Sequence, residues 1–167
     1  VHRHRKLIYR LLFQAVWSTL NRFGHDPKRL DGQLGAMLVL HTRGQNLGRH
    51  AHIHCLEPSG ALQSNMRWRP AKLTYLFPVR ALSRCYRGKM VSSIRAAWTD
   101  FDDIEGNEFD AVLNALMKVA WNVYSEPVIS KTETIVGYLA RYTRRIGLTN
   151  VRLLKVDGTH VCVAISR

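Results

Sequence analysis

Hydrophobic and polar residues alternate along the chain in patterns that predict both helices and strands. Residues 2–23 carry a rough apolar stripe, which predicts an amphipathic helix ended by Gly24. The continuous apolar run within residues 36–42 predicts a buried strand, and residues 50–56 predict another. Because only a polar turn separates these two segments, we expect them to form a hairpin.

The rest of the chain follows the same mixed pattern. Further helices are expected at residues 79–98, 108–118 and 130–145, and further strands at residues 61–69, 119–124, 151–156 and 160–165. The helix at 130–145 begins with a capping-box sequence, and the last two strands flank the turn dipeptide Asp157-Gly158. The expected fold is therefore a single α+β domain over residues 1–167, an antiparallel sheet of about five strands with packed helices.

The excess of basic residues indicates what kind of molecule the chain binds. The chain has 25 Lys and Arg against 12 Asp and Glu, a net charge of +13, and 46% hydrophobic residues. A folded domain this basic usually binds a polyanion, most often nucleic acid, although ribosome-bound and membrane-surface proteins share the property. The three cysteines are scattered, which argues against a disulfide framework and favours a reducing cytoplasm. No apolar run approaches the ~20 residues of a membrane span.

Three histidines alternate along the second predicted strand. His50, His52 and His54 are separated by single residues, so strand geometry places all three on one face. The outer two are about 13 Å apart at a rise of ~3.3 Å per residue, too far to share a metal ion. The candidate ligand pair is therefore His52 with His54, or His50 with His52.

Two imidazoles need a third ligand to hold a metal ion. His41 on the preceding strand and Gln45 in the turn are both close enough along a hairpin to supply it. Such an open site suits Mg²⁺ or Mn²⁺ bound jointly by the protein and a phosphate. The simpler interpretation is that the alternating histidines project from a half-exposed strand and bind no metal ion.

Two tyrosines share a face of the helix predicted at residues 130–145. Tyr138 and Tyr142 are four residues apart, and Arg141, Arg144 and Arg145 place cations beside them. Guanidinium groups suit a phosphodiester that a phenol could attack. A phenol of pKa ~10 is a poor nucleophile at pH 7, so this chemistry needs a metal ion as well. The alternative is that both tyrosines simply pack on the sheet.

One tryptophan is a candidate for stacking on a nucleic-acid base. Trp68 lies between Arg67 and Arg69, whereas Trp98 and Trp121 stand in apolar surroundings and are expected in the core. A merely solvated basic surface would also explain this pattern.

Two segments together resemble a known family. They are Leu40-His41-Thr42-Arg43-Gly44-Gln45-Asn46-Leu47 with His50-Ala51-His52-Ile53-His54-Cys55, and Tyr138-Leu139-Ala140-Arg141-Tyr142-Thr143-Arg144-Arg145. The chain resembles, over nearly its whole length, the HUH two-tyrosine transposases of the IS-ninety-one type. Either segment alone is too short to be specific, whereas the combination is specific.

The resemblance implies an HUH endonuclease-like fold and rolling-circle transposition of an insertion sequence. A tyrosine attacks a phosphate of single-stranded DNA, becomes linked to the 5′ phosphate and frees a 3′-OH, and the second tyrosine allows a further strand transfer. Carried over to this sequence, Tyr138 and Tyr142 are the nucleophiles, and His52 and His54 are ligands of the divalent metal. The expected partner is DNA, mainly single-stranded, and the expected location is the bacterial cytoplasm, associated with the nucleoid.

Some features depart from the family pattern. The family commonly has Trp, Pro and His where this chain has Arg43, Ala51 and Arg144. It also usually carries a cysteine-rich zinc module before the catalytic domain, and this chain is expected to begin after it. Two alternatives remain: a rolling-circle replication initiator with the same chemistry, and a catalytically inactive DNA-binding remnant.

Overall fold

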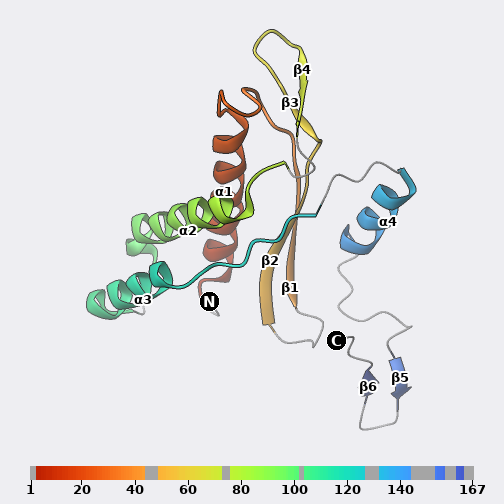
Figure 1. Ribbon diagram of the computed structural model, residues 1–167. Coiled ribbons are helices and arrows are strands. Elements are labelled where there is room, and N and C mark those ends of the chain that lie inside the picture. Colours follow the sequence, from red (N-terminus) through yellow and green to blue (C-terminus); the bar gives the residue numbers. More distant parts are fainter. Residues whose placement is uncertain are drawn as a thin grey trace. The chain divides into compact units, whose positions relative to one another are not determined.

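The computed structural model describes residues 3–43, 49–72, 76–101, 104–126, 132–143, 153–156 and 161–163. The chain divides into two compact units. The first contains Val1–Ala36 and Glu57–Val128, and the second contains Met37–Leu56 and Ile129–Arg167. Helices and short antiparallel strands occur in both (Figure 1).

Three α-helices occur among the described residues of the first unit. They are α1 (Arg5–Gly24), α2 (Val79–Ala96) and α3 (Gly106–Lys118), with a short 3-10 helix, η1 (Trp98–Asp100), between the last two. Helix α2 packs against both α1 and α3. The helices predicted at residues 2–23, 79–98 and 108–118 are confirmed, with ends shifted by up to three residues. Pro78 occupies the N-cap position of α2 with extended backbone (φ −70°, ψ 117°), and its side chain makes no capping hydrogen bond.

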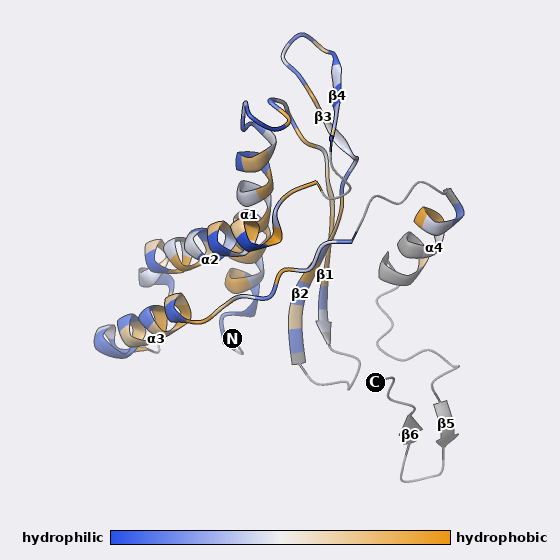
Figure 2. Ribbon diagram, in the orientation of Figure 1, coloured by the Kyte–Doolittle hydropathy of each residue, from blue (hydrophilic) through white to orange (hydrophobic). Residues whose placement is uncertain are grey.

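The hydrophobic core of the first unit lies among these helices. Leu113 of α3 is only 1% exposed, and Phe109 one turn earlier contacts the rings of Trp98 and Phe101 with centroid separations of 4.4 and 5.5 Å. The helices carry hydrophobic positions beside strongly hydrophilic ones, so each can bury one stripe and solvate the other (Figure 2). The other buried apolar residues are Leu11, Leu12, Ala15, Leu20, Leu30, Leu34, Ala61, Phe77, Leu82, Met90, Val91, Ile94 and Phe101.

A single strand over residues 61–69 was the wrong prediction. The segment instead forms a small hairpin of β3 (Gly60–Leu62) and β4 (Trp68–Pro70), in which Leu62 pairs with Trp68. The chain reverses at Met66, whose φ of 62° is unusual for a residue other than glycine. Because this turn contains no glycine, the sequence did not predict it.

The strand predicted at residues 119–124 is also absent. These residues form no ladder with another strand of the described chain. Their backbone is held instead by side chains of α2: Ser83 Oγ donates to the carbonyl of Trp121 at 2.6 Å, and Arg87 donates to the carbonyl of Val119 at 2.6 Å. An apolar, β-branched segment can thus lie extended on a helix without pairing as a strand.

The described residues of the second unit form two hairpins and one helix. Strands β1 (Met37–Arg43) and β2 (Arg49–Leu56) form one hairpin, and β5 (Leu153–Val156) and β6 (Val161–Val163) form the other. Helix α4 (Thr132–Thr143) confirms the helix predicted around residues 130–145. The turn predicted at Asp157-Gly158 lies outside the described residues.

The overall class is mixed α and β, as predicted. In the described part of the chain the strands form three separate two-stranded antiparallel sheets, and one sheet of five strands is not present there. None of the described helices is both long enough and apolar enough to span a membrane.

Candidate metal centre

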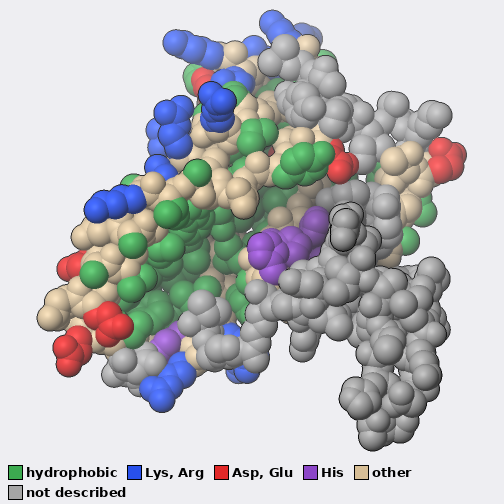
Figure 3. All heavy atoms as spheres, turned by 60° about the horizontal axis from the view of Figure 1, so that its bottom comes forward, with side chains coloured by type: hydrophobic (Ala, Val, Ile, Leu, Met, Phe, Trp, Pro, Cys, Tyr) green, Lys and Arg blue, Asp and Glu red, His purple; other side chains and the backbone are tan. Residues whose placement is uncertain are grey.

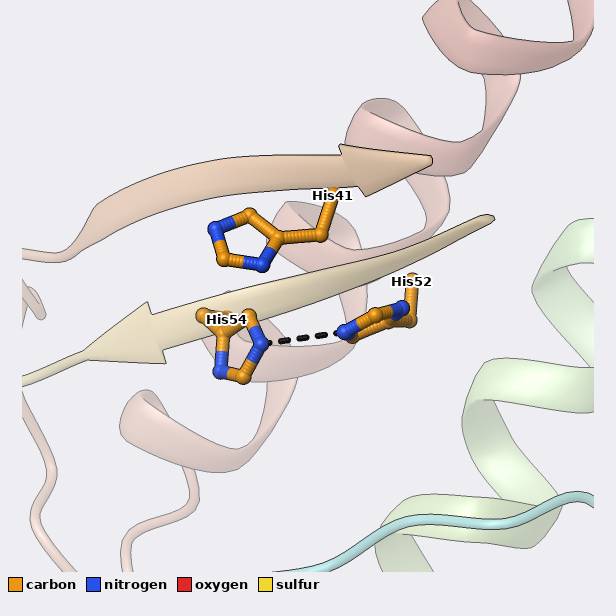
Figure 4. A group of neighbouring side chains, drawn as sticks. All are labelled: His41, His52 and His54. Carbon is orange, nitrogen blue, oxygen red and sulfur yellow. Dashed lines mark hydrogen bonds between the residues drawn. The ribbon is translucent and has the colours of Figure 1, made fainter. Parts of the chain in front are cut away.

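The register of the β1–β2 hairpin brings histidines of both strands onto one face. His41 pairs directly with His52, and Val39 pairs with His54. Because directly opposed residues of an antiparallel pair project to the same side, His41, His52 and His54 share a face. Their rings point toward one another between the two strands (Figure 4).

The three imidazoles are close enough to bind one ion. One nitrogen from each lies within 4.8 Å of the others, and all three side chains are half-buried. The Nε2 atoms of His52 and His54 are 3.0 Å apart. The ring of His41 is centred 4.5 Å from that of His54 and 5.5 Å from that of His52. Histidine side chains also form a visible group on the molecular surface (Figure 3).

A backbone carbonyl orients the central histidine. Nδ1 of His52 lies 2.9 Å from the carbonyl oxygen of His50. A carbonyl oxygen can only accept, so Nδ1 of His52 carries a proton, which leaves Nε2 as the nitrogen available to a metal ion. Metal-binding histidines are commonly fixed in this way through their second ring nitrogen. This role of His50 could not be predicted from the sequence, because every residue type has a main-chain oxygen.

The electrostatics keep His54 neutral. Its pKa falls from 6.5 to about 4, first because burial disfavours the charged ring and then because His41 and His52 lie close to it. At pH 7 its ring nitrogens are therefore not both protonated, and a metal ion need not displace an imidazolium proton from His54.

The spacing of the donor atoms fits a metal ion. With metal–nitrogen bonds of about 2.1 Å, two ligands at right angles lie about 3.0 Å apart. Nε2 of His52 accepts a hydrogen bond from Nε2–H of His54 at 3.0 Å (Figure 4), and an ion held by both nitrogens would replace this shared proton at about the same separation. Two ligands of one ion are at most about 4.2 Å apart, so a group whose nitrogens lie within 4.8 Å of one another needs only small ring movements to complete the set.

Comparison with known proteins assigns the chain to a family. Residues 35–167 match the family described as "Putative transposase". The chain belongs to this transposase family. It is 34% identical over 166 residues to "Putative transposase y4qJ" of Sinorhizobium fredii (strain NBRC 101917 / NGR234), an alignment that covers 93% of this chain and 42% of that protein. The chain therefore spans less than half the length of this curated relative, and no solved structure matches it significantly.

The part of the chain that matches the transposase family contains both predicted motifs. Tyr138, Arg141 and Tyr142 all lie within α4, where the two tyrosine positions are one helical turn apart. Arg144 and Arg145 lie outside the described residues, as does Gln45, the alternative third ligand. His50 has its ring centred 4.9 Å from that of His52 but is not among the three clustered ligands.

The predicted stacking residue of this transposase-family chain lies in the first unit. Trp68 is 51% exposed on β4, the highest exposure of the four tryptophans. Trp98 contacts Phe109, and Trp121 donates its indole N–H to the carbonyl of Leu116 at 3.0 Å. The core placement expected for those two is thus consistent with their contacts, although neither is fully buried.

Proposed function

We propose that this chain is the catalytic part of a transposase that cuts and rejoins single-stranded DNA through a phosphotyrosine. The observation that carries the proposal is the cluster of His41, His52 and His54, with His52 oriented by the carbonyl of His50. Membership of the transposase family supports DNA as the substrate, and the net charge of +13 supports binding of a polyanion. Family membership also favours transposition over replication initiation.

The proposed roles follow from the chemistry of the side chains. The three histidines hold a divalent ion, which, when bound, polarises the scissile phosphate and stabilises its developing charge. The phenol oxygen of Tyr138 or Tyr142 attacks phosphorus as its proton leaves to solvent. The bond from phosphorus to the 3′ oxygen breaks, and that oxygen takes up a proton. The products are a 5′-phosphotyrosine and a free 3′-OH, and Arg141, Arg144 and Arg145 hold the phosphate.

The donor set favours one of the two expected metals. Mg²⁺ prefers oxygen ligands and keeps its water shell, whereas Mn²⁺ accepts imidazole nitrogen more readily. We therefore propose Mn²⁺ as the ion held most firmly by the three histidines, with Mg²⁺ as the weaker alternative. A single catalytic domain over residues 1–167 and a five-stranded sheet remain predictions of the same proposal.

Covalent adduct formation tests this function. The protein is incubated with a pool of single-stranded oligonucleotides and Mn²⁺, then separated by denaturing electrophoresis and mapped by peptide mass spectrometry. We expect an adduct on Tyr138 or Tyr142, its loss in the double variant Tyr138→Phe, Tyr142→Phe, and its loss with EDTA.

Matched variants separate this result from general damage. Tyr124 is 84% exposed and lies outside α4, so Tyr124→Phe should leave the adduct unchanged. An adduct that survives the double tyrosine change refutes the nucleophile assignment. A domain that binds DNA but forms no adduct with any oligonucleotide, even in the full-length protein, is the inactive remnant instead.

A further inference from the structure

The β3–β4 hairpin presents an aromatic side chain among cations. Arg67, Arg69 and Lys72 lie in or next to the hairpin, and residues 58–72 contain no Asp or Glu. Residues 64–68 are all exposed. Exposed Trp68 therefore stands in a positively charged surface that no acidic residue of its own segment neutralises.

The indole ring of Trp68 packs against Gly60. A Cβ atom at Gly60 would lie 2.6 Å from Cζ2 of the indole ring and 2.6 Å from the carbonyl oxygen of Arg69. Any side chain at position 60 would thus displace the ring. The ring of Trp68 lies against the strand at Gly60 while half of the residue stays open to solvent.

The hairpin is anchored at both ends of its strands. Gln33 and Leu62 exchange two backbone hydrogen bonds of 2.8 and 2.9 Å, and the backbone N–H of Ala71 donates to the carbonyl of Ser59 at 3.0 Å. Arg69 contacts the carboxylate of Asp31 at 3.8 Å. The aromatic ring is consequently held in place before any ligand binds, which lowers the entropy lost on binding.

We propose that the β3–β4 hairpin is a binding site for single-stranded DNA, with Trp68 stacking on an unpaired base and Arg67 contacting the adjacent phosphate. Aromatic rings bind the faces of bases, and arginine beside them binds the backbone. A duplex keeps its bases stacked inside, so it cannot offer a free base face to Trp68. The site rests on the proposed function only in that single-stranded DNA is the substrate. It lies in the first unit, whereas the three clustered histidines belong to the second.

Two separate measurements test the two contacts. Binding of fluorescein-labelled oligo(dT) is measured by anisotropy in EDTA, where the proposed nicking reaction is off. Trp68→Ala should weaken binding roughly 10-fold or more with an unchanged salt dependence, and Trp68→Phe should restore part of the loss. Arg67→Gln should lower the slope of log affinity against log salt by about 0.7, the value for one phosphate contact to a single strand.

Gly60→Ala tests whether the position of the Trp68 ring against Gly60 matters for binding. Its added Cβ displaces the indole, so this variant should bind oligo(dT) about as weakly as Trp68→Ala although every DNA-contacting side chain remains. Trp17→Phe, at another exposed tryptophan (37% exposed) on α1, should bind as the wild type does. Thermal unfolding of each variant identifies any that fail to fold.

The outcomes are distinct. Trp68→Ala with wild-type affinity overturns the proposal. So does a loss of affinity for duplex DNA equal to that for oligo(dT), since stacking on an unpaired base would then be excluded. A change in oligomeric state on Trp68→Ala, with DNA affinity unchanged, also overturns it and assigns the surface to a second copy of the chain. Normal EDTA binding by a protein that forms no adduct would leave this site standing while the proposed function fails.

Discussion

Binding of Mn²⁺ to the histidine cluster should stabilise the fold by a predictable amount. A ligand that binds only the folded chain adds RT ln(1 + [L]/Kd) to the free energy of unfolding, about 2.7 kcal/mol when the free metal is 100 times Kd. For a domain of this size, that amount raises the melting temperature by roughly 5–10 °C. The unfolded chain offers no such preformed set, whereas the fold holds three ring nitrogens within 4.8 Å.

Removing one donor should remove most of that shift. His41→Ala, His52→Ala and His54→Ala each leave two imidazoles, and we expect Kd to rise on the order of 100-fold. At the same free metal, the remaining stabilisation would be about 0.4 kcal/mol, or roughly 1 °C. The assay is thermal unfolding followed by circular dichroism, at several Mn²⁺ concentrations and again after EDTA.

His50→Ala is the matched control. It removes an exposed imidazole from the same strand but keeps the carbonyl that accepts the 2.9 Å hydrogen bond from His52. The metal-induced shift should survive in this variant. A full shift in all three donor variants would refute the site. A shift that is lost in His50→Ala but kept in His54→Ala would identify His50 and His52 as the ligand pair instead.

Two further predictions concern the stability of the fold. Burial raises the pKa of Glu57 from 4.5 to about 7, so its protonated form stabilises the fold fully below pH 4.5 and this contribution is lost as the pH rises to 7. The free energy of unfolding of the wild type minus that of Glu57→Gln, measured in urea, should therefore fall by at most about 3 kcal/mol over that range, and parallel curves for the two proteins would exclude this contribution of Glu57. Leu113→Ala, at a side chain 1% exposed, should cost about 2–5 kcal/mol. Val112→Ala, at the neighbouring residue that is 51% exposed, should cost under about 1 kcal/mol, and equal losses would contradict the assigned packing of α3.

The elements that the sequence predicted correctly are those set by local pattern. Helices α1 and α2 have apolar stripes, and Pro78 marks the start of α2. The predicted strand at 119–124 failed for a different reason. Val119 and its neighbours favour extended backbone, but a strand also needs a partner, and side chains of α2 bind these carbonyls instead. Pairing is a property of the whole fold and cannot be obtained from one segment.

The candidate site was predictable in part. Alternation alone placed His52 and His54 on one face, as the structure has them. The presence of His41 in the cluster depends on register, since a shift of one residue would turn its ring to the opposite face. Nothing in the sequence specifies that Met37 pairs with Leu56, and with it that His41 pairs with His52. The sequence therefore left His41 and Gln45 as equal candidates.

The three proposed activities should separate in the variants, because each depends on different atoms. His52→Ala should lose both Mn²⁺ stabilisation and the adduct while still binding oligo(dT) in EDTA. The double tyrosine variant should lose only the adduct, since a hydroxyl at each site is all that changes. Trp68→Ala should keep the Mn²⁺ shift, lose affinity, and recover adduct formation at saturating DNA. A basic domain without catalytic chemistry could reproduce the loss of affinity, but it could not give an adduct that requires both the histidines and the tyrosines.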